Sequence, residues 1–189
     1  ATLIQGLFQE NERKEKLRRI KKSRAKESTL EDRFNISLTY PSAYKTVKDT
    51  INFIWIEKPV QKGTLNLIVY TLPLNEVSSN PLTQIKNMRD SIGKLYVPGR
   101  LPGSHMITEE AYLPYLFKTE LDGKEAYLTK GMWEVKKDFM AGPFLNYKVK
   151  DEKNDQWIIV EGFAFAPSLS KRDYMFELNT IISSFKQKK

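Results

Sequence analysis

Residues 115–166 contain the stretch that decides the fold, and they read YLFKTELDGKEAYLTKGMWEVKKDFMAGPFLNYKVKDEKNDQWIIVEGFAFA. Apolar and β-branched residues gather here in runs of strand length, separated by turn signals such as Asp122-Gly123 and the polar DEKND. The runs predict four strands in meander order, at residues 115–121, 124–135, 143–150 and 156–166. Because short turns join successive strands antiparallel, we expect a mainly antiparallel sheet.

Three further strands are predicted upstream of this meander. Residues 34–40, FNISLTY, alternate apolar and polar side chains and stop at Pro41, which has no N–H to donate to a ladder. Residues 52–57 form a second strand ended by Pro59, and residues 64–72 form a third. The third run is apolar almost throughout, which predicts a central strand buried on both faces.

Two helices are expected to pack on the sheet. Asn80 and Pro81 have the residue types of an N-cap and a first helical position. The apolar residues that follow at helical spacing are Leu82, Ile85, Met88, Ile92, Leu95 and Tyr96. A last helix is expected after Ser170, which forms a capping-box pattern with Asp173. Its inward residues are expected to be Tyr174, Leu178, Ile181, Ile182 and Phe185. This order of elements predicts an α+β fold in which an antiparallel sheet buries both helical stripes.

Most of the net positive charge of the chain lies before this predicted domain. The net charge is +8, and residues 10–27 contain nine Lys or Arg against four Glu. Good helix formers from Thr2 to about Ala25 predict a long basic helix, so we divide the chain into this helix, residues 1–27, and an α+β domain, residues 28–189. A solvated helix face is the favoured interpretation of the charge, and contact with nucleic acid or an anionic membrane is the alternative.

The first two turns of the basic helix carry an apolar stripe that does not continue along it. The stripe comprises Leu3, Ile4, Leu7 and Phe8. Large apolar side chains in a stripe favour burial against another surface. The hypothesis is that they contact a preceding module that this chain lacks, a second copy of the chain, or its own body, and a partner outside the body is favoured.

Residues suited to catalysis or metal binding are sparse. The chain has no Cys, which excludes thiol chemistry, and His105 is its one His, which excludes a two-histidine zinc site. Dinucleotide-binding, phosphate-binding and GxSxG motifs are absent. We therefore expect no cofactor and no metal, and we interpret His105 as an exposed loop residue. A hydrolase that uses His105 with a carboxylate is the enzymatic alternative.

Residues 131–144, GMWEVKKDFMAGPF, form the candidate binding segment. One interpretation is a hairpin connection in which Trp133 and Phe139 fill the core and Asp138 caps backbone N–H groups. The other interpretation places an aromatic residue beside acidic residues at the rim of a pocket, because loops often carry binding residues. The candidate binding residues are Trp133, Glu134, Asp138, Phe139, Met140, Gly142 and Pro143.

This segment also resembles a known family, together with the stretches FNISLTYP, KLYVPG, VEGFAFAP and KRDYMFELNTIISSF. The resemblance is to the C-terminal part of Bacteroidetes envelope lipoproteins known only as a domain of unknown function, and it covers nearly the whole chain. It implies a location in the cell envelope and a lost preceding module with a lipid anchor. With the missing catalytic motifs, it favours a non-catalytic envelope domain that binds a partner protein or ligand. A looser resemblance to PsbP-like domains implies an α/β/α sandwich.

Overall fold

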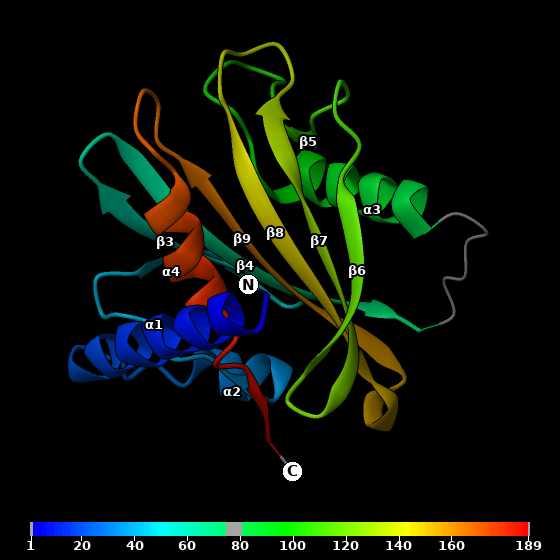
Figure 1. Cartoon of the computed structure of the whole chain (residues 1–189). Coiled ribbons are helices and arrows are strands. Elements are labelled where there is room, and N and C mark those ends of the chain that lie inside the picture. Colours follow the sequence, from blue (N-terminus) through cyan, green and yellow to red (C-terminus); the bar gives the residue numbers. More distant parts are fainter. Residues whose placement is uncertain (1, 75–80, 189) are drawn as a thin grey trace.

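The computed structural model describes residues 2–74 and 81–188, with the side chains described from residue 8 onward except for residue 9. In these residues, helices lie on both faces of an eight-stranded antiparallel sheet (Figure 1). The order of the sheet is β2-β3-β4-β9-β8-β7-β5, and β6 also pairs with β7. The predicted α+β class and the mainly antiparallel sheet are confirmed.

The helices are α1 Thr2–Lys22, α2 Thr29–Phe34, α3 Pro81–Tyr96 and α4 Arg172–Ile182, with a short 3-10 turn at Glu152–Asn154. The strands of the main sheet are β2 Lys45–Thr50, β3 Phe53–Val60, β4 Gly63–Pro73, β5 Met106–Thr108, β6 Tyr115–Leu121, β7 Lys124–Val135, β8 Ala141–Asp151 and β9 Gln156–Phe165. A separate two-stranded sheet pairs β1 Ile36–Ser37 with β10 Lys186–Gln187.

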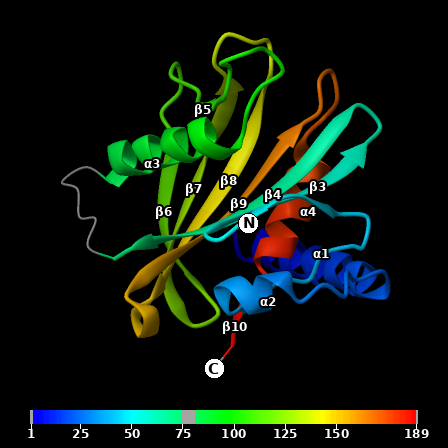
Figure 2. The ribbon, with the colours of Figure 1, turned by 180° about the vertical axis from the view of Figure 1, so that it is seen from behind.

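Each face of the main sheet carries its own hydrophobic core. Helices α1, α2 and α4 lie on one face, where Ile181 of α4 is fully buried in a cluster with Val160 of β9. Helix α3 lies on the opposite face (Figure 2). There Ile85 packs in a cluster with Phe163 and Trp133. Each fully buried side chain of this kind contributes about 1.5–3 kcal/mol. The molecule is therefore an α/β/α sandwich, as expected.

The predicted meander is present with nearly the expected bounds. Strands β6, β7, β8 and β9 pair in chain order, each antiparallel to the next. The two-residue turn between β6 and β7 has positive φ at both positions, 54° at Asp122 and 74° at Gly123. Asp and Gly tolerate this conformation, which matches the twist of the strands it joins. Strand β4 lies between β3 and β9, so its prediction as a central strand is also confirmed.

The strand predicted at residues 34–40 is wrong over most of its length. Phe34 ends α2, and only Ile36 and Ser37 pair, with β10. Burial nevertheless alternates from Ile36 to Tyr40, because this extended segment lays one side against the α1–α4 core. The alternating pattern thus indicated an extended backbone with one buried side, and such a backbone does not require a neighbouring strand.

Three smaller expectations about element ends are also corrected. Strand β3 continues through Pro59 to Val60, because β2 pairs no further than Glu57 and the missing N–H of Pro59 interrupts no ladder on that side. Helix α4 has Lys171, not Ser170, as its N-cap, and no side chain caps it. Leu95, expected on the buried stripe, is exposed. The predicted N-cap Asn80 lies outside the described residues.

Strands β2 and β5 were not predicted, for different reasons. Strand β2 is a charged and mostly exposed edge strand, so it shows no hydrophobic alternation. Strand β5 has only three residues, too few for a periodic pattern.

The basic helix joins the body through its last turns. Ile20 is buried in the α4 core, and Lys16 Nζ lies 2.8 Å from a carboxylate oxygen of Glu177. Just beyond the helix, the backbone N–H of Ala25 donates to Tyr40 O at 2.9 Å. Of the predicted stripe, Leu3, Ile4 and Leu7 have side chains outside the described residues. Phe8 is 71% exposed.

A chain without residues 1–22 is expected to keep a single cooperative unfolding transition. The truncation removes the buried side chain of Ile20 but retains the backbone contacts from Ser23 onward, so the free energy of unfolding should fall by about 2–3 kcal/mol. Urea denaturation followed by circular dichroism measures both quantities. Loss of the cooperative transition would show that α1 and the sheet fold as one unit.

A buried ion pair holds α3 against the sheet. Arg89 of α3 and Glu161 of β9 form two parallel hydrogen bonds, of 2.8 Å from Nε and 2.6 Å from Nη2. Arg89 Nη1 also donates to Thr108 Oγ1 at 2.6 Å, and Asn146 Nδ2 donates to Glu161 at 2.7 Å. The guanidinium stacks 3.5 Å above the centre of the Phe144 ring. Both charges are buried, so each depends on the other and on these neighbours.

Candidate functional site

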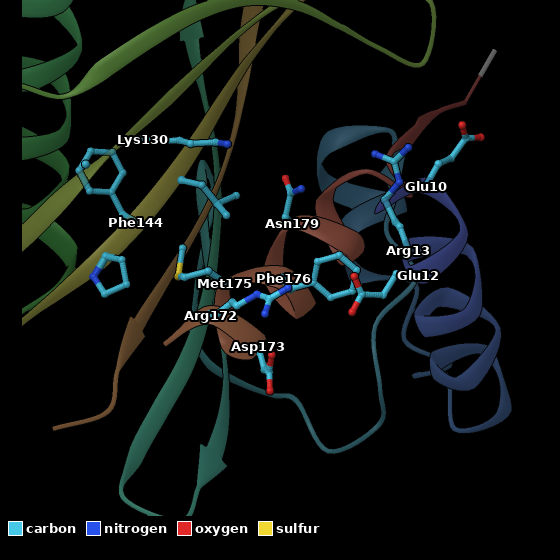
Figure 3. Close-up of a pocket in the computed structure, with 13 residues that line it drawn as sticks. Glu10, Glu12, Arg13, Lys130, Phe144, Arg172, Asp173, Met175, Phe176 and Asn179 are labelled. Carbon is cyan, nitrogen blue, oxygen red and sulfur yellow. The ribbon is translucent and has the colours of Figure 1, made fainter. Parts of the chain in front are cut away.

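A groove lies between helices α1 and α4 and the open face of β7 and β8. A hollow of about 570 Å³ is lined by Arg13 of α1, Arg172 and Phe176 of α4, Lys130 of β7 and Leu145 of β8. Figure 3 shows Lys130 and Phe144 on the strand side, with the α4 residues across the hollow and Arg13 beyond them. Its lining thus combines apolar side chains with cations from three elements.

The hollow continues along α1 toward the far end of β6. A second hollow of about 330 Å³ shares Arg13 with the first and is lined by Leu17 of α1, Leu121 of β6 and Tyr147 of β8. We call the two hollows together the α1–β6 groove. It exists because α4 packs on β4, β8 and β9, which leaves the same face of β6 and β7 without a helix directly upon it.

Aromatic side chains are exposed on this uncovered face. Tyr115 of β6 is 72% exposed and pairs in register with Lys130. Phe117, two residues further along β6, therefore points to the same face, and it is also exposed. Lys130 Nζ lies 5.7 Å from the centre of the Phe117 ring, so the aromatic side chains of β6 adjoin the cations of the groove.

Three cations of the groove are available to a ligand. Within the described residues, no carboxylate lies within 4.0 Å of the charged groups of Arg13, Lys130 or Arg172. Glu10, by contrast, is paired with Lys14 at 2.8 Å, whose ammonium lowers the pKa of that carboxyl. The groove also contains Glu12 and Asp173, so its lining carries both positive and negative side chains.

Strand β6 has an outer edge with which no strand of the described part of the chain pairs. It pairs with β7 over all seven residues without a shift in register. At the opposite edge of the sheet, β2 has a register shift between Thr46 and Lys48 and two lysines along it. Bulges and lysines are common devices that prevent an edge from accepting another strand. Strand β6 lacks the bulge, so its edge is the more receptive one.

The structure separates the residues of the predicted binding segment. Trp133 is 2% exposed and packs in the α3-side core, with its ring 5.5 Å from that of Phe163. The interpretation in which Trp133 fills the core is therefore confirmed for this residue. Gly142 lies behind it, where a Cβ would stand 2.0 Å from Ala164 O. Pro143 lines the α1–β6 groove, and Met140 packs partly against the α3-side core.

The remaining candidates lie at the tip of the β7–β8 hairpin. Phe139 is 102% exposed, so the expectation that it fills the core is wrong. The Asp138 carboxylate accepts a hydrogen bond from the Phe139 N–H at 2.7 Å, which agrees with its predicted capping role. Glu134, Asp138 and Phe139 line another hollow, also of about 570 Å³, that shares no residue with the groove.

His105 is half-buried beside β5, not in an exposed loop as expected. It lines a shallow hollow with Asp90, Glu110 and Ser91. The Ser91 hydroxyl donates to Asn87 O at 2.8 Å.

Ser104, which precedes His105 in the chain, also has its hydroxyl in a hydrogen bond. Ser104 donates its hydroxyl hydrogen to Leu101 O at 2.6 Å. In the part of the chain that is described, no group of three His, Cys, Asp or Glu is arranged to hold a metal ion.

Sequence reasoning missed Tyr115, Phe117, Lys130 and Arg172. A signal for the first two was present, because residues 115–121 were predicted as a strand and large aromatics two apart on one face are visible in it. Lys130 and Arg172 carried no comparable signal, since only the packing of α4 brings them to the same groove.

Comparisons with known proteins bear on the family and on the fold. The model of a family described as "Domain of unknown function (DUF4837)" matches residues 23–184, and this match begins directly after α1. No curated protein matches the chain.

Two solved structures are similar in outline. The Ran-binding protein Mog1p of Saccharomyces cerevisiae is 10% identical over 81% of this chain and 90% of its own, with a TM-score of 0.46. LpqN of Mycobacterium tuberculosis, involved in cell envelope biogenesis, is 12% identical over 80% of this chain and 82% of its own, with a TM-score of 0.43.

None of the helices in the described part of the chain combines the length and the apolar character needed to cross a bilayer.

Proposed function

The chain belongs to the DUF4837 family, and we propose that it is a non-catalytic domain that binds a partner protein along the α1–β6 groove. The observation that carries this proposal is the uncovered face of β6, where Tyr115 and Phe117 stand exposed beside the groove. Exposed apolar side chains that gather on one face of a folded domain mark interaction sites. The neighbouring cations add specificity for a partner with acidic groups.

An extended segment of the partner fits this surface best. A strand added to the edge of β6 would gain backbone hydrogen bonds, and every second side chain would face the groove. Apolar side chains could then pack on Phe117 and Leu145, while an acidic one could pair with Lys130. Phe8 is exposed on the same helix as Arg13, and we keep the stripe Leu3, Ile4, Leu7 and Phe8 as a contact with a partner outside the body.

The enzymatic alternative depends on His105, and its surroundings give it little support. Hydrolysis by this residue would need a nucleophile or an activated water near the imidazole. Ser91 and Ser104, the serines nearest to it in the hollow and in the chain, each donate their hydroxyl hydrogen to a backbone carbonyl. We therefore favour binding without catalysis, through a surface that does not include His105.

The setting that we propose is the cell envelope. The residue patterns at 131–144 and 171–185 resemble those of envelope lipoproteins, which supports an envelope component as the partner. A small ligand in the same groove is the alternative, since a hollow of about 570 Å³ has the size of a ligand pocket.

Site-specific photo-crosslinking in the cells that make the protein tests the proposed surface. A benzoylphenylalanine in place of Phe117 should form an adduct with one particular protein, whereas the same group in place of Ile51 should not. Ile51 is a matched control because it is 81% exposed and lies in the β2–β3 turn, away from the groove. Lys130→Glu should reduce the Phe117 adduct about tenfold, since it reverses a charge at the contact.

Two results would overturn the proposed function. Equal adducts from both positions would show that the exposed aromatic face of β6 is not a specific contact. Co-purification of a small molecule bound in the groove, with no protein adduct at Phe117, would show that the groove binds a small ligand and not a partner protein.

A further inference from the structure

Two apolar side chains project from neighbouring loops at one end of the sheet. Phe139 stands at the tip of the β7–β8 hairpin, and Leu101, which is 51% exposed, belongs to the loop between α3 and β5. The guanidinium of Arg100 joins the two loops through hydrogen bonds of 2.7 and 3.0 Å to the Asp138 carboxylate. We call residues 100–101 and 136–139 the Phe139 tip, and Figure 1 shows its two loops side by side above β7 and β8.

The Phe139 tip is held in a defined shape. The Lys136 N–H donates to His105 O at 2.9 Å, and the Asp138 N–H donates to Val135 O at 3.1 Å. The hydrogen bonds from Arg100 hold the pKa of Asp138 below its usual range, which favours the charged carboxylate that this ion pair requires. The backbone is therefore well supported where it projects Phe139 away from the protein, and the ring contacts no core.

Lysines lie close to Phe139 in the chain and at the same end of the sheet. Lys136 and Lys137 are exposed and adjoin Phe139 in the chain, while Asp138 is neutralised by Arg100. Lys62 lies in the β3–β4 turn at the same end of the sheet, as the pairing of Thr64 with Phe165 and of Phe144 with Phe163 shows. Glu134 and Glu110, whose carboxylate is paired with Lys86 at 3.3 Å, line the hollow beside the tip.

We propose that the Phe139 tip docks on an anionic lipid surface, with Phe139 and Leu101 inserted among the headgroups and Lys136 and Lys137 paired with lipid phosphates. Aromatic and aliphatic side chains flanked by lysines are favoured in the interfacial region of a bilayer. Each lysine near an anionic leaflet adds to the attraction. The apolar side chains stand on a convex tip, and a bilayer surface accommodates such a shape without a matching cavity.

A nucleic acid is the less suitable occupant of this tip. Single strands bind in grooves where successive bases stack on aromatic rings, whereas here one ring stands beside an aliphatic side chain on a protruding loop. Docking by the tip is also independent of the partner proposed above, because the tip and the α1–β6 groove share no residue.

The absence of cysteine from the chain permits a direct test of insertion. Phe139→Cys, labelled with an environment-sensitive fluorophore, is mixed with vesicles of equimolar phosphatidylcholine and phosphatidylglycerol. Its emission should rise several-fold and shift to the blue, and vesicles of phosphatidylcholine alone should produce little change. The same label on Ile51→Cys, at the opposite end of the sheet, should stay in an aqueous environment with both vesicles.

A pair of charge reversals distinguishes the tip from the basic helix. Lys136→Glu with Lys137→Glu should weaken sedimentation with the anionic vesicles about tenfold or more. Lys21→Glu with Lys22→Glu, two exposed neighbours on α1, changes the net charge equally and should weaken it much less. Phe139→Ser in the unlabelled chain should also weaken binding, because insertion contributes beyond charge.

Three outcomes would overturn the proposal. The label at position 139 could remain aqueous with anionic vesicles, or respond no more than the label at position 51. The reversal on α1 could abolish binding while the reversal at the tip leaves it intact, which would assign lipid contact to the helix. Unchanged binding of Phe139→Ser, with competition by soluble polyanions such as single-stranded DNA, would indicate an electrostatic contact without insertion.

Discussion

Replacement of Arg89 by Met is expected to lower the free energy of unfolding by about 3–5 kcal/mol. The change leaves the Glu161 carboxylate buried and without its charged partner, and among the described residues Asn146 would remain as its hydrogen-bond donor. Thr108 also loses the hydrogen bond that it accepts from the guanidinium. Urea denaturation of the variant and the parent chain, followed by circular dichroism, measures the loss.

The double variant Arg89→Met with Glu161→Leu is the matched control. Removing both charges together avoids an unpaired buried ion, so the double variant should be more stable than Arg89→Met alone. This non-additivity identifies the ion pair as the cause. A single variant that loses less than about 1 kcal/mol, or a double variant that loses the sum of both single changes, would show that water reaches the pair and screens it.

The sheet and its two packed helices could be predicted because their signals are local. Runs such as residues 64–72 and 156–166 carry enough apolar side chains to indicate strands wherever they lie in the fold. The first strand prediction, at residues 34–40, was wrong because alternation reports one buried side, and α1 and α4 supply the covering surface there.

The buried ion pair could not have been found from periodicity. Arg89 falls among apolar residues of α3, and Glu161 interrupts an apolar strand run, but each on its own is compatible with an exposed position. Only the placement of α3 across β9 and β5 brings the two charges together. A charge inside an apolar run is therefore a signal that something must pair with it, without indicating which residue does so.

The candidate site shows the same limit. The motif at residues 131–144 was recognised, but its side chains diverge into a core, a groove wall and a hairpin tip. In a strand, successive side chains point to opposite faces, so Trp133 and Glu134 cannot line one pocket. The α1–β6 groove arises from how far α4 extends across the sheet, which no short sequence pattern records.

Trp133→Ala is expected to cost about 3–5 kcal/mol of the free energy of unfolding. The ring fills the core beneath α3, meets the Phe163 ring edge-on and lies tilted against the Phe165 ring. Its Nε1 has no hydrogen-bond partner in the part of the chain that is described, so the loss comes from packing. The denaturation midpoint and slope in urea determine the cost.

Phe139→Ala is the matched control in the same segment, and it should change the free energy of unfolding by less than about 0.5 kcal/mol. Each substitution removes one aromatic ring, and the two positions are six residues apart in the chain. Only the ring of Trp133 is buried. The same contrast separates stability from lipid binding, because Phe139→Ala should weaken vesicle binding in a chain that remains as stable as the parent. A loss below about 1 kcal/mol for Trp133→Ala would mean that the core beneath α3 closes over the missing ring.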